Sequence, residues 1–183
     1  MLTLYKAMVR SLVEYCCPLW HPTKIRDIQE LDGVQKTFTA RIAGMQDMHY
    51  WDRLSHLSLM SLQRRRERFI ILHMWKILNN KTSNDLNIQF VSRPRFGNLA
   101  VIPSKYPSSS AANQSLYDNS FAVQGPRLWN AVPYHLNVIS DLEQFKDQLT
   151  KFMLSIPDKP PIRGYTPPNS NSCLLYTSPS PRD

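Results

Sequence analysis

The chain has 183 residues, of which 42% are hydrophobic and 20% are charged. This composition predicts a globular core, and the length fits one ordinary domain or two small ones. The longest apolar run, FIILHMWKIL, is interrupted by His73 and Lys76 and is too short to cross a bilayer, so we expect no membrane partner. The three cysteines form no C-x-x-C pair and no zinc spacing, which favours a reducing, intracellular location in the nucleus or the cytoplasm.

The positive charge is concentrated in the first half of the chain. Lysine plus arginine exceed aspartate plus glutamate by 22 to 14, a net charge of +8. Residues 1–82 hold 13 basic and 7 acidic side chains, whereas residues 83–183 hold 9 and 7. A basic first half favours an anionic partner, nucleic acid first. Solubility alone would also account for a net charge of this size.

Helical periodicity recurs along most of the chain and predicts a mainly α fold. Residues 2–16 have an amphipathic pattern whose apolar side comprises Leu4, Tyr5, Met8, Val9, Leu12, Val13, Tyr15 and Cys16. We expect Thr23 to cap a second helix that stops at Gly44. A short helix is expected around Trp51–Leu57.

Two later helices have clear start signals. Ser61 is expected to cap the long helix LQRRRERFIILHMWKILNN. The sequence Ser140-Asp141-Leu142-Glu143 matches a capping box and predicts that the last helix starts at Ser140. Between these helices the periodicity disappears, and only NLAVIP (98–103) is compatible with a short strand.

These elements predict a small helical bundle and a helical C-terminal extension, joined by an irregular linker. The expected boundaries are 1–82 for the bundle, 83–118 for the linker, 119–157 for the extension and 158–172 for a proline-rich tail, with 173–183 separate from all of them.

No catalytic constellation is present in the sequence. It contains no glycine-rich phosphate loop, no G-x-S-x-G and no H-E-x-x-H, and its five histidines are scattered. We therefore predict no catalytic residues, no metal site, no cofactor and no small-molecule substrate, and we expect that this chain is not an enzyme.

The strongest local feature is RRRER (64–68), at the start of the long helix. Four arginines in the first two turns oppose the helix dipole, at about 0.3–1 kcal/mol each in the first turn, so helix stability alone does not explain them. A helical projection gathers the side chains of one arc opposite the apolar side, namely Arg65, Arg66, Phe69, His73 and Lys76. Cations beside an aromatic ring suit a phosphate backbone with a base or sugar, which predicts a nucleic-acid site. The alternative is a solvated face that keeps an apolar helix soluble.

Five motifs in order, at similar spacing, resemble a known family. They are LYKAMVRSLVEYCCPLWHP, IQELDGVQKTFTARIAG, RLSHLSLMSLQRRRERFIILHMWKIL, FAVQGPRLWNAVP and LEQFKDQL. Residues 2–154 resemble the end of the reverse transcriptase of a non-LTR (LINE-type) retrotransposon of the jockey-like kind.

The resemblance implies the later part of a polymerase thumb and a helical extension, which would contact RNA or an RNA–DNA duplex. It also implies an upstream palm domain as a partner. The catalytic aspartates and the divalent metal would belong to that palm, and this chain has no Asp-Asp pair.

The positions that match the family are not catalytic ones. They are Tyr15, Pro18, Trp20, Pro22, Arg53, Leu54, Leu57, Ser61, Leu62, Arg65, Arg66, Trp129, Asn130, Pro133 and Phe145. We expect Tyr15, Trp20 and Trp129 to be packing anchors and Asn130 to satisfy local backbone groups. A host helical module that binds a protein partner through its apolar helices is the alternative function.

The last eleven residues, CLLYTSPSPRD (173–183), have no helix or strand period. They resemble the translation of a transposase-type sequencing-library adapter, so we exclude them from the expected fold. The alternative is a disordered Ser-Pro tail.

Overall fold

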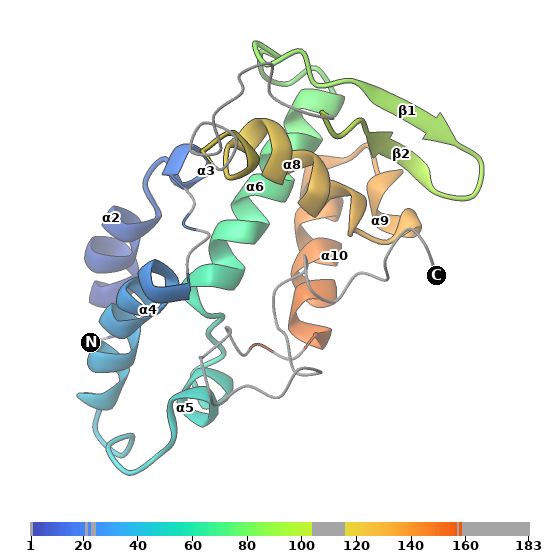
Figure 1. Cartoon of the computed structure of the whole chain (residues 1–183). Coiled ribbons are helices and arrows are strands. Elements are labelled where there is room, and N and C mark those ends of the chain that lie inside the picture. The colour runs from blue at the N-terminus through green and yellow to red at the C-terminus, as the bar shows by residue number, and fades with distance from the viewer. Residues whose placement is uncertain (1, 21, 23–24, 104–115, 157, 159–183) are drawn as a thin grey trace.

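The computed structural model describes residues 2–20, 22, 25–103, 116–156 and 158, and it is mainly helical, which confirms the predicted fold class (Figure 1). Its elements are, in chain order, α1 (Leu2–Leu4), the π-helical η1 (Tyr5–Val9), α2 (Arg10–Glu14), α3 (Cys17–Trp20), α4 (Ile25–Ala40), α5 (Tyr50–His56), α6 (Leu62–Leu78), β1 (Phe90–Arg93), β2 (Gly97–Ala100), α8 (Phe121–Asn130), α9 (Tyr134–Asn137) and α10 (Leu142–Ser155).

The long helix α6 lies at the centre of the fold. It packs against α3 and α4 from the first part of the chain and against α8 and α10 from the last part (Figure 1). Its sequence explains this position, because apolar side chains surround most of its second half and leave only a narrow polar line. A helix that is apolar on most sides is stable in water only when neighbours cover it.

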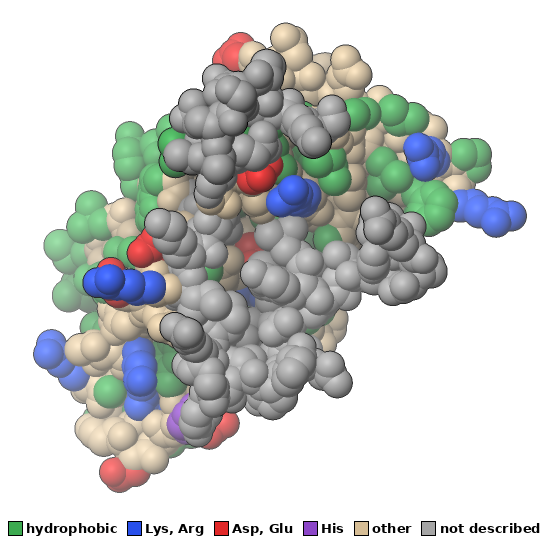
Figure 2. All heavy atoms as spheres, in the orientation of Figure 1, with side chains coloured by type: hydrophobic (Ala, Val, Ile, Leu, Met, Phe, Trp, Pro, Cys, Tyr) green, Lys and Arg blue, Asp and Glu red, His purple; other side chains and the backbone are tan. Residues whose placement is uncertain are grey.

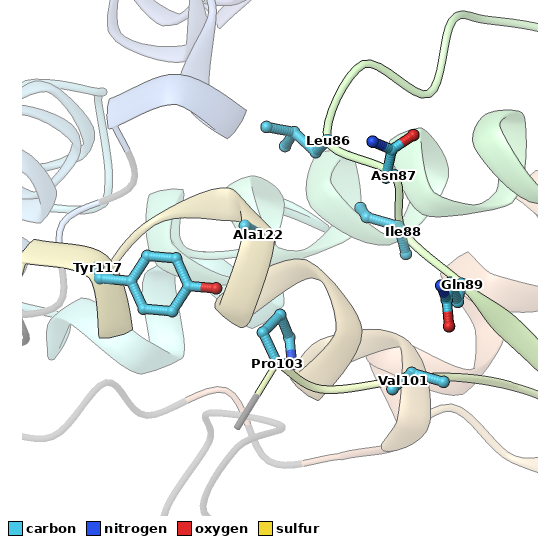
Figure 3. A pocket seen from close by; sticks show the side chains of 8 residues that line it. All are labelled: Leu86, Asn87, Ile88, Gln89, Val101, Pro103, Tyr117 and Ala122. Carbon is cyan, nitrogen blue, oxygen red and sulfur yellow. The ribbon is translucent and has the colours of Figure 1, made fainter. Parts of the chain in front are cut away.

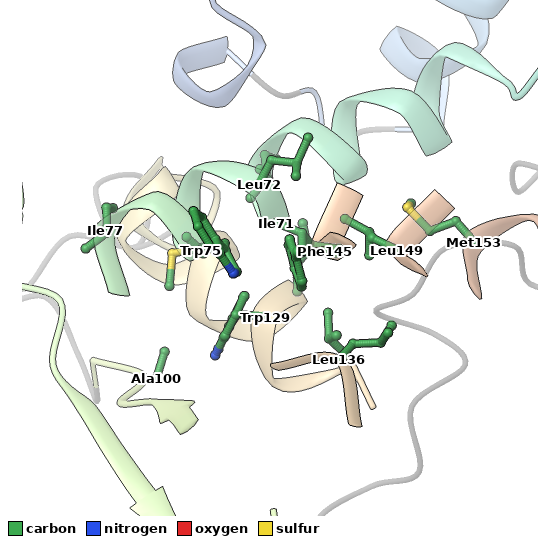
Figure 4. Packing of buried hydrophobic residues seen from close by; sticks show 14 of the residues in the cluster. Ile71, Leu72, Trp75, Ile77, Ala100, Trp129, Leu136, Phe145, Leu149 and Met153 are labelled. Carbon is green, nitrogen blue, oxygen red and sulfur yellow. The ribbon is translucent and has the colours of Figure 1, made fainter. Parts of the chain in front are cut away.

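One hydrophobic core joins α6 to the helices that follow the hairpin (Figure 4). Trp75 of α6, Trp129 of α8 and Phe145 of α10 are each at most 1% exposed. The centroid of the Phe145 ring lies 5.8 Å from that of Trp75 and 6.0 Å from that of Trp129. The predicted separation of residues 1–82 from an extension over 119–157 is therefore wrong, because α6 shares its core with α8 and α10.

The first helical segment, residues 2–14, turns most of its apolar side outward. Tyr5 is the buried member, with its ring stacked 4.3 Å from that of Phe38 and its hydroxyl donating to Gln35 Oε1 at 2.9 Å. Other residues of the predicted buried side are exposed, namely Leu4, Met8, Leu12, Tyr15 and Cys16. The predicted packing roles of Tyr15 and Trp20 are wrong, since both side chains are exposed.

An antiparallel β-hairpin interrupts the segment that was predicted to be an irregular linker. The strands β1 and β2 pair Phe90 with Ala100 and Arg93 with Gly97. The expected short strand over 98–103 is confirmed only as far as Ala100. The prediction of an irregular 83–118 is wrong for the hairpin, which packs on α8 and α9.

The helix ends agree in part with the predicted caps. Ser61 Oγ accepts a hydrogen bond from Arg64 N at 3.0 Å and caps α6 as expected. The cap of α10 is Asp141 rather than Ser140, with Oδ2 accepting from Gln144 N at 2.8 Å. The helix α4 ends at Ala40, before the predicted stop at Gly44, which has a φ of +79° in the following turn.

Several predictions fall outside the described residues. They are the Thr23 cap, the KYPSSSAANQS part of the linker, the proline-rich tail after Asp158 and the adapter-like segment 173–183.

We expect Trp129→Ala to reduce the free energy of unfolding by about 3–5 kcal/mol, because it removes a fully buried ring from the core. Trp129→Phe keeps an aromatic ring but loses the indole donor to Asn98 O, and should cost about 1–3 kcal/mol. Urea denaturation measures both changes. The control is Leu154→Ala, which alters a side chain that is 60% exposed and should change stability by less than about 0.5 kcal/mol. Equal stability of Trp129→Ala and wild type would contradict the core described above.

Candidate nucleic-acid interface

The arginines of RRRER bind neighbouring segments instead of forming one exposed face. Arg64 is 1% exposed and donates from Nη1 to Met153 O of α10 at 3.2 Å, and its Nε lies 4.0 Å from Asp158 Oδ1. Arg68 donates from Nε to Thr150 Oγ1 of the same helix at 3.1 Å. Both arginines therefore attach the start of α6 to α10.

Arg65 points toward the first helical segment. Its guanidinium forms a two-pronged ion pair with Glu14 of α2, in which Nη2 lies 2.9 Å from Oε2 and Nε contacts Oε1. The guanidinium carbon also lies 5.5 Å from the centroid of the Phe69 ring. The charge of Arg65 is thus partly neutralised within the protein.

Arg66 is fully buried, and its predicted position on an exposed polar arc is wrong. It lies on the side of α6 that α3 and α4 cover, where its charged or titratable neighbours are Asp32, Cys17, Glu67 and Glu14. Nη2 donates to Gln63 Oε1 at 3.3 Å. Burial lowers the pKa of the guanidinium, and Asp32 partly opposes this effect. A side chain in this position holds helices together and has no access to a phosphate.

Asp32 is the acidic counterpart of Arg66 in this buried region. Its Oδ1 accepts from Leu62 N at 2.9 Å, so it caps the first turn of α6 from α4. Burial raises the pKa of the carboxyl group from 3.8 to about 7, with Arg66 and the backbone N–H groups of Leu62 and Gln63 opposing the rise and Asp158 adding to it. Asp158 caps the same end of the helix, accepting from Ser61 N at 2.6 Å and from Ser61 Oγ at 2.7 Å.

The other predicted site residues follow one line on α6. Arg65, Phe69, His73 and Lys76 recur at helical spacing, and none of them is fully buried. The His73 ring meets the Phe121 ring edge-on at a centroid distance of 5.2 Å. Burial and the neighbouring Lys76 lower the pKa of His73, so its imidazole is neutral at pH 7. Lys76 is the exposed cation at the end of the line.

Two members of this line carry a positive charge. Lys76 is accessible, and Arg65 has both a carboxylate and an aromatic face beside it. Lys76 is the member of this line that is placed to meet a phosphate, because Glu14 and the Phe69 ring already contact the Arg65 guanidinium. It holds no pair of carboxylates with which to position a metal for phosphoryl transfer. Among the residues that the structure describes, no group of three or more His, Cys, Asp or Glu side chains is arranged to hold a metal ion.

Two clefts in the surface lie away from this line. One, of about 230 Å³, is bordered by Leu86, Asn87, Ile88, Gln89, Val101, Pro103, Tyr117 and Ala122, none of them charged (Figure 3). The other, of about 270 Å³, lies between α4 and the start of α5 and is lined by Gln29, Asp32, Gly33, Lys36, His49, Tyr50 and Trp51. Acidic, basic and histidine side chains border the second cleft but not the first.

The sequence analysis missed the acidic partners of the arginines. Glu14, Asp32 and Asp158 lie 51, 34 and 94 positions from the arginines that they face, taking Arg65, Arg66 and Arg64 in turn. Glu14 and Asp32 each lie within a predicted helix, but nothing in the sequence near them points to an arginine of α6. A helical projection treats each helix alone and therefore assigns such residues to solvent.

The chain was compared with known protein families, curated proteins and solved structures, and none of them matches it. None of the helices in the described part of the chain is both long enough and apolar enough to span a membrane.

The buried carboxyl group of Asp32 predicts an unusual dependence of stability on pH. The folded state keeps its proton up to about pH 7, whereas the unfolded state loses it near 3.8. Protonation therefore stabilises the fold as the pH falls from 8 to 5, opposite to a carboxylate with a lowered pKa. Relative to Asp32→Asn, which cannot titrate, the wild type should gain about 2 kcal/mol of stability between pH 8 and pH 5.

Parallel urea titrations of the two proteins at both pH values measure this difference, and comparison with the variant removes the contribution of His73. The asparagine keeps an oxygen for Leu62 N, so the cap itself is retained. A wild type whose advantage over the variant grows at high pH would show that Asp32 is stabilised as an anion, contrary to the burial described here.

Proposed function

We propose that this chain is a non-catalytic, thumb-like part of a retroelement RNA-directed DNA polymerase. Its role is to bind the backbone of RNA or of an RNA–DNA duplex while an upstream palm domain carries out synthesis. The catalytic aspartates and the divalent metal ions of the polymerase belong to that palm. No chemical step is assigned to the residues of this chain.

The observation that carries the proposal is the convergence of the family-like motifs on one helix. The motif of α6 has the other motifs as neighbours, because α3, α4, α8 and α10 all pack against it. Motifs that lie far apart in the sequence are therefore parts of one helical body. The net charge of +8 and the accessible line that ends at Lys76 support an anionic partner for that body.

A specific observation favours the second candidate, a helical module that binds a protein. Leu4, Met8 and Leu12 are 61–77% exposed and lie one helical turn apart on the first helical segment. Tyr15 and Leu19 continue the apolar surface at 74% and 84% exposure. A line of apolar side chains of this length is typical of an interaction surface. It suits a host partner protein, and under the polymerase proposal it suits the palm domain.

Nucleic-acid binding tests the first candidate directly. The full chain should bind an RNA–DNA duplex with little sequence preference and with an affinity that falls steeply as salt rises. Lys76→Gln should weaken binding and reduce the slope of log affinity against log salt by about 0.7–0.9, the contribution of one phosphate contact. Fluorescence anisotropy across a salt series measures both quantities.

The matched control is Lys36→Gln, which removes one exposed charge from α4 and leaves the line on α6 intact. Arg66→Ala is unsuitable as a binding variant, because Arg66 is buried and its loss would test folding. Equal effects of Lys76→Gln and Lys36→Gln would show diffuse charge instead of a site on α6. A chain that is folded but does not bind the duplex would favour the protein-binding module.

A further inference from the structure

The tip of the β-hairpin projects from the helical body as an exposed basic and aromatic surface. The turn contains Arg93, Pro94, Arg95 and Phe96, and all four are exposed, with Phe96 at 57%. Arg93 is in register with Gly97, so no side chain opposes it on the facing strand. Figure 2 shows basic side chains at the outer end of the hairpin with hydrophobic ones beside them, on the edge of the molecule farthest from α4 in Figure 1.

Side chains of α8 and α9 hold the hairpin in place through hydrogen bonds to its backbone. Asn137 of α9 donates to Phe96 O at 3.1 Å, and the indole of Trp129 donates to Asn98 O at 2.5 Å. Asn130 spans the base of the hairpin, accepting from Ala100 N at 2.8 Å and donating to Ala100 O at 2.9 Å. Trp129 and Asn130 therefore both support the hairpin, about thirty residues away in the sequence. The prediction that Asn130 satisfies local backbone groups is wrong, whereas Trp129 is buried as a packing anchor should be.

The turn itself has a defined geometry. Phe96 N donates to Arg93 O at 3.1 Å, with Pro94 at the second turn position, where its fixed φ suits such a turn. Gly97 follows with a φ of +70°, and a Cβ there would come 2.0 Å from Asn137 Oδ1. Both the conformation and the contact require glycine. The direction in which the tip points is thus set by the fold.

Within the described residues, the two arginines of the tip differ from Arg64 and Arg65 of α6 in their lack of an acidic partner. Neither Arg93 nor Arg95 forms an ion pair with another described residue, whereas Arg64 and Arg65 both face carboxylates. Tyr134, which is 49% exposed, lies against Gly97 and adds a second aromatic side chain. The tip therefore carries unneutralised charge next to aromatic rings on a rigid support.

We infer that the hairpin tip is a second nucleic-acid contact, in which Arg93 and Arg95 bind successive phosphates of a single strand and Phe96 stacks on an unpaired base. This inference rests on the proposed function and adds a surface to it that α6 does not provide. Guanidinium groups with free donors bind phosphate oxygens. An exposed aromatic ring accepts a base of any sequence, because every base has a π-face. An anionic surface without bases, such as inorganic polyphosphate, would satisfy the arginines but give Phe96 no role.

The test uses the full chain and two probes: an RNA–DNA duplex with a single-stranded RNA overhang, and the same duplex with blunt ends. Arg93→Gln/Arg95→Gln should reduce the salt slope on the overhang probe by about 1.4–1.8, the sum of two phosphate contacts. Phe96→Ala should weaken binding to the overhang probe roughly fivefold and leave blunt-duplex and polyphosphate binding unchanged. The control is Lys36→Gln/Arg41→Gln, which removes two exposed charges at the far end of α4.

The outcomes separate this inference from the proposed function. Loss of the overhang preference in the Phe96 variant, with the control unchanged, supports the tip as a strand-binding site. If the tip variants and the control variant lose equal affinity relative to the wild type, the hairpin inference is overturned and the proposed function stays in place. A folded wild type that binds neither nucleic-acid probe overturns both. Circular dichroism of each variant confirms folding, which these exposed substitutions should preserve.

Discussion

The fold depends on four arginines at the beginning of α6 whose side chains extend toward different neighbouring helices. Within two turns, Arg64 and Arg68 attach to α10, Arg65 to α2, and Arg66 enters the region covered by α3 and α4. Arginine suits this role because its planar fork donates in several directions and its long stem packs against apolar neighbours. The unfavourable position of these cations relative to the helix dipole is offset in part by capping, since Asp32 and Asp158 accept hydrogen bonds from the same end of the helix.

This arrangement divides the positive charge of the chain into two populations. The arginines of α6 are neutralised or buried inside the protein and give the first half of the sequence a basic composition without a basic surface of the same size. Lys76 and the arginines of the hairpin tip are exposed. The net charge therefore overstates the positive charge that is accessible to a partner at the surface. The location of each cation decides which surface attracts an anion.

Helical periodicity was sufficient to predict the mainly α fold, the preference of serine for N-caps predicted the cap at Ser61, and the family resemblance implied Trp129 as a packing anchor. Helical periodicity failed for side chains whose burial depends on a segment that is distant in the sequence. Arg66 projects onto a polar arc of its own helix, yet another helix covers that arc. Leu12 projects onto the same apolar side as Tyr5, yet Tyr5 packs against α4 while Leu12 is 77% exposed. The hairpin was missed because its strands have four residues each, and because a proline and a glycine flank the turn and mimic a loop.

The hydrogen bonds between Ser61 and Asp158 join residues 97 positions apart and so close a loop of about half of the 183-residue chain. A contact of such long range is formed late, because the entropy of closing the loop is lost before the contact contributes any stabilisation. During synthesis, the first turn of α6 leaves the ribosome long before Asp158 exists. Until that later part is made, the nascent α6 lacks the Asp158 cap and the α10 partners of Arg64 and Arg68, whereas Glu14 and Asp32 precede α6 in the chain and are already present.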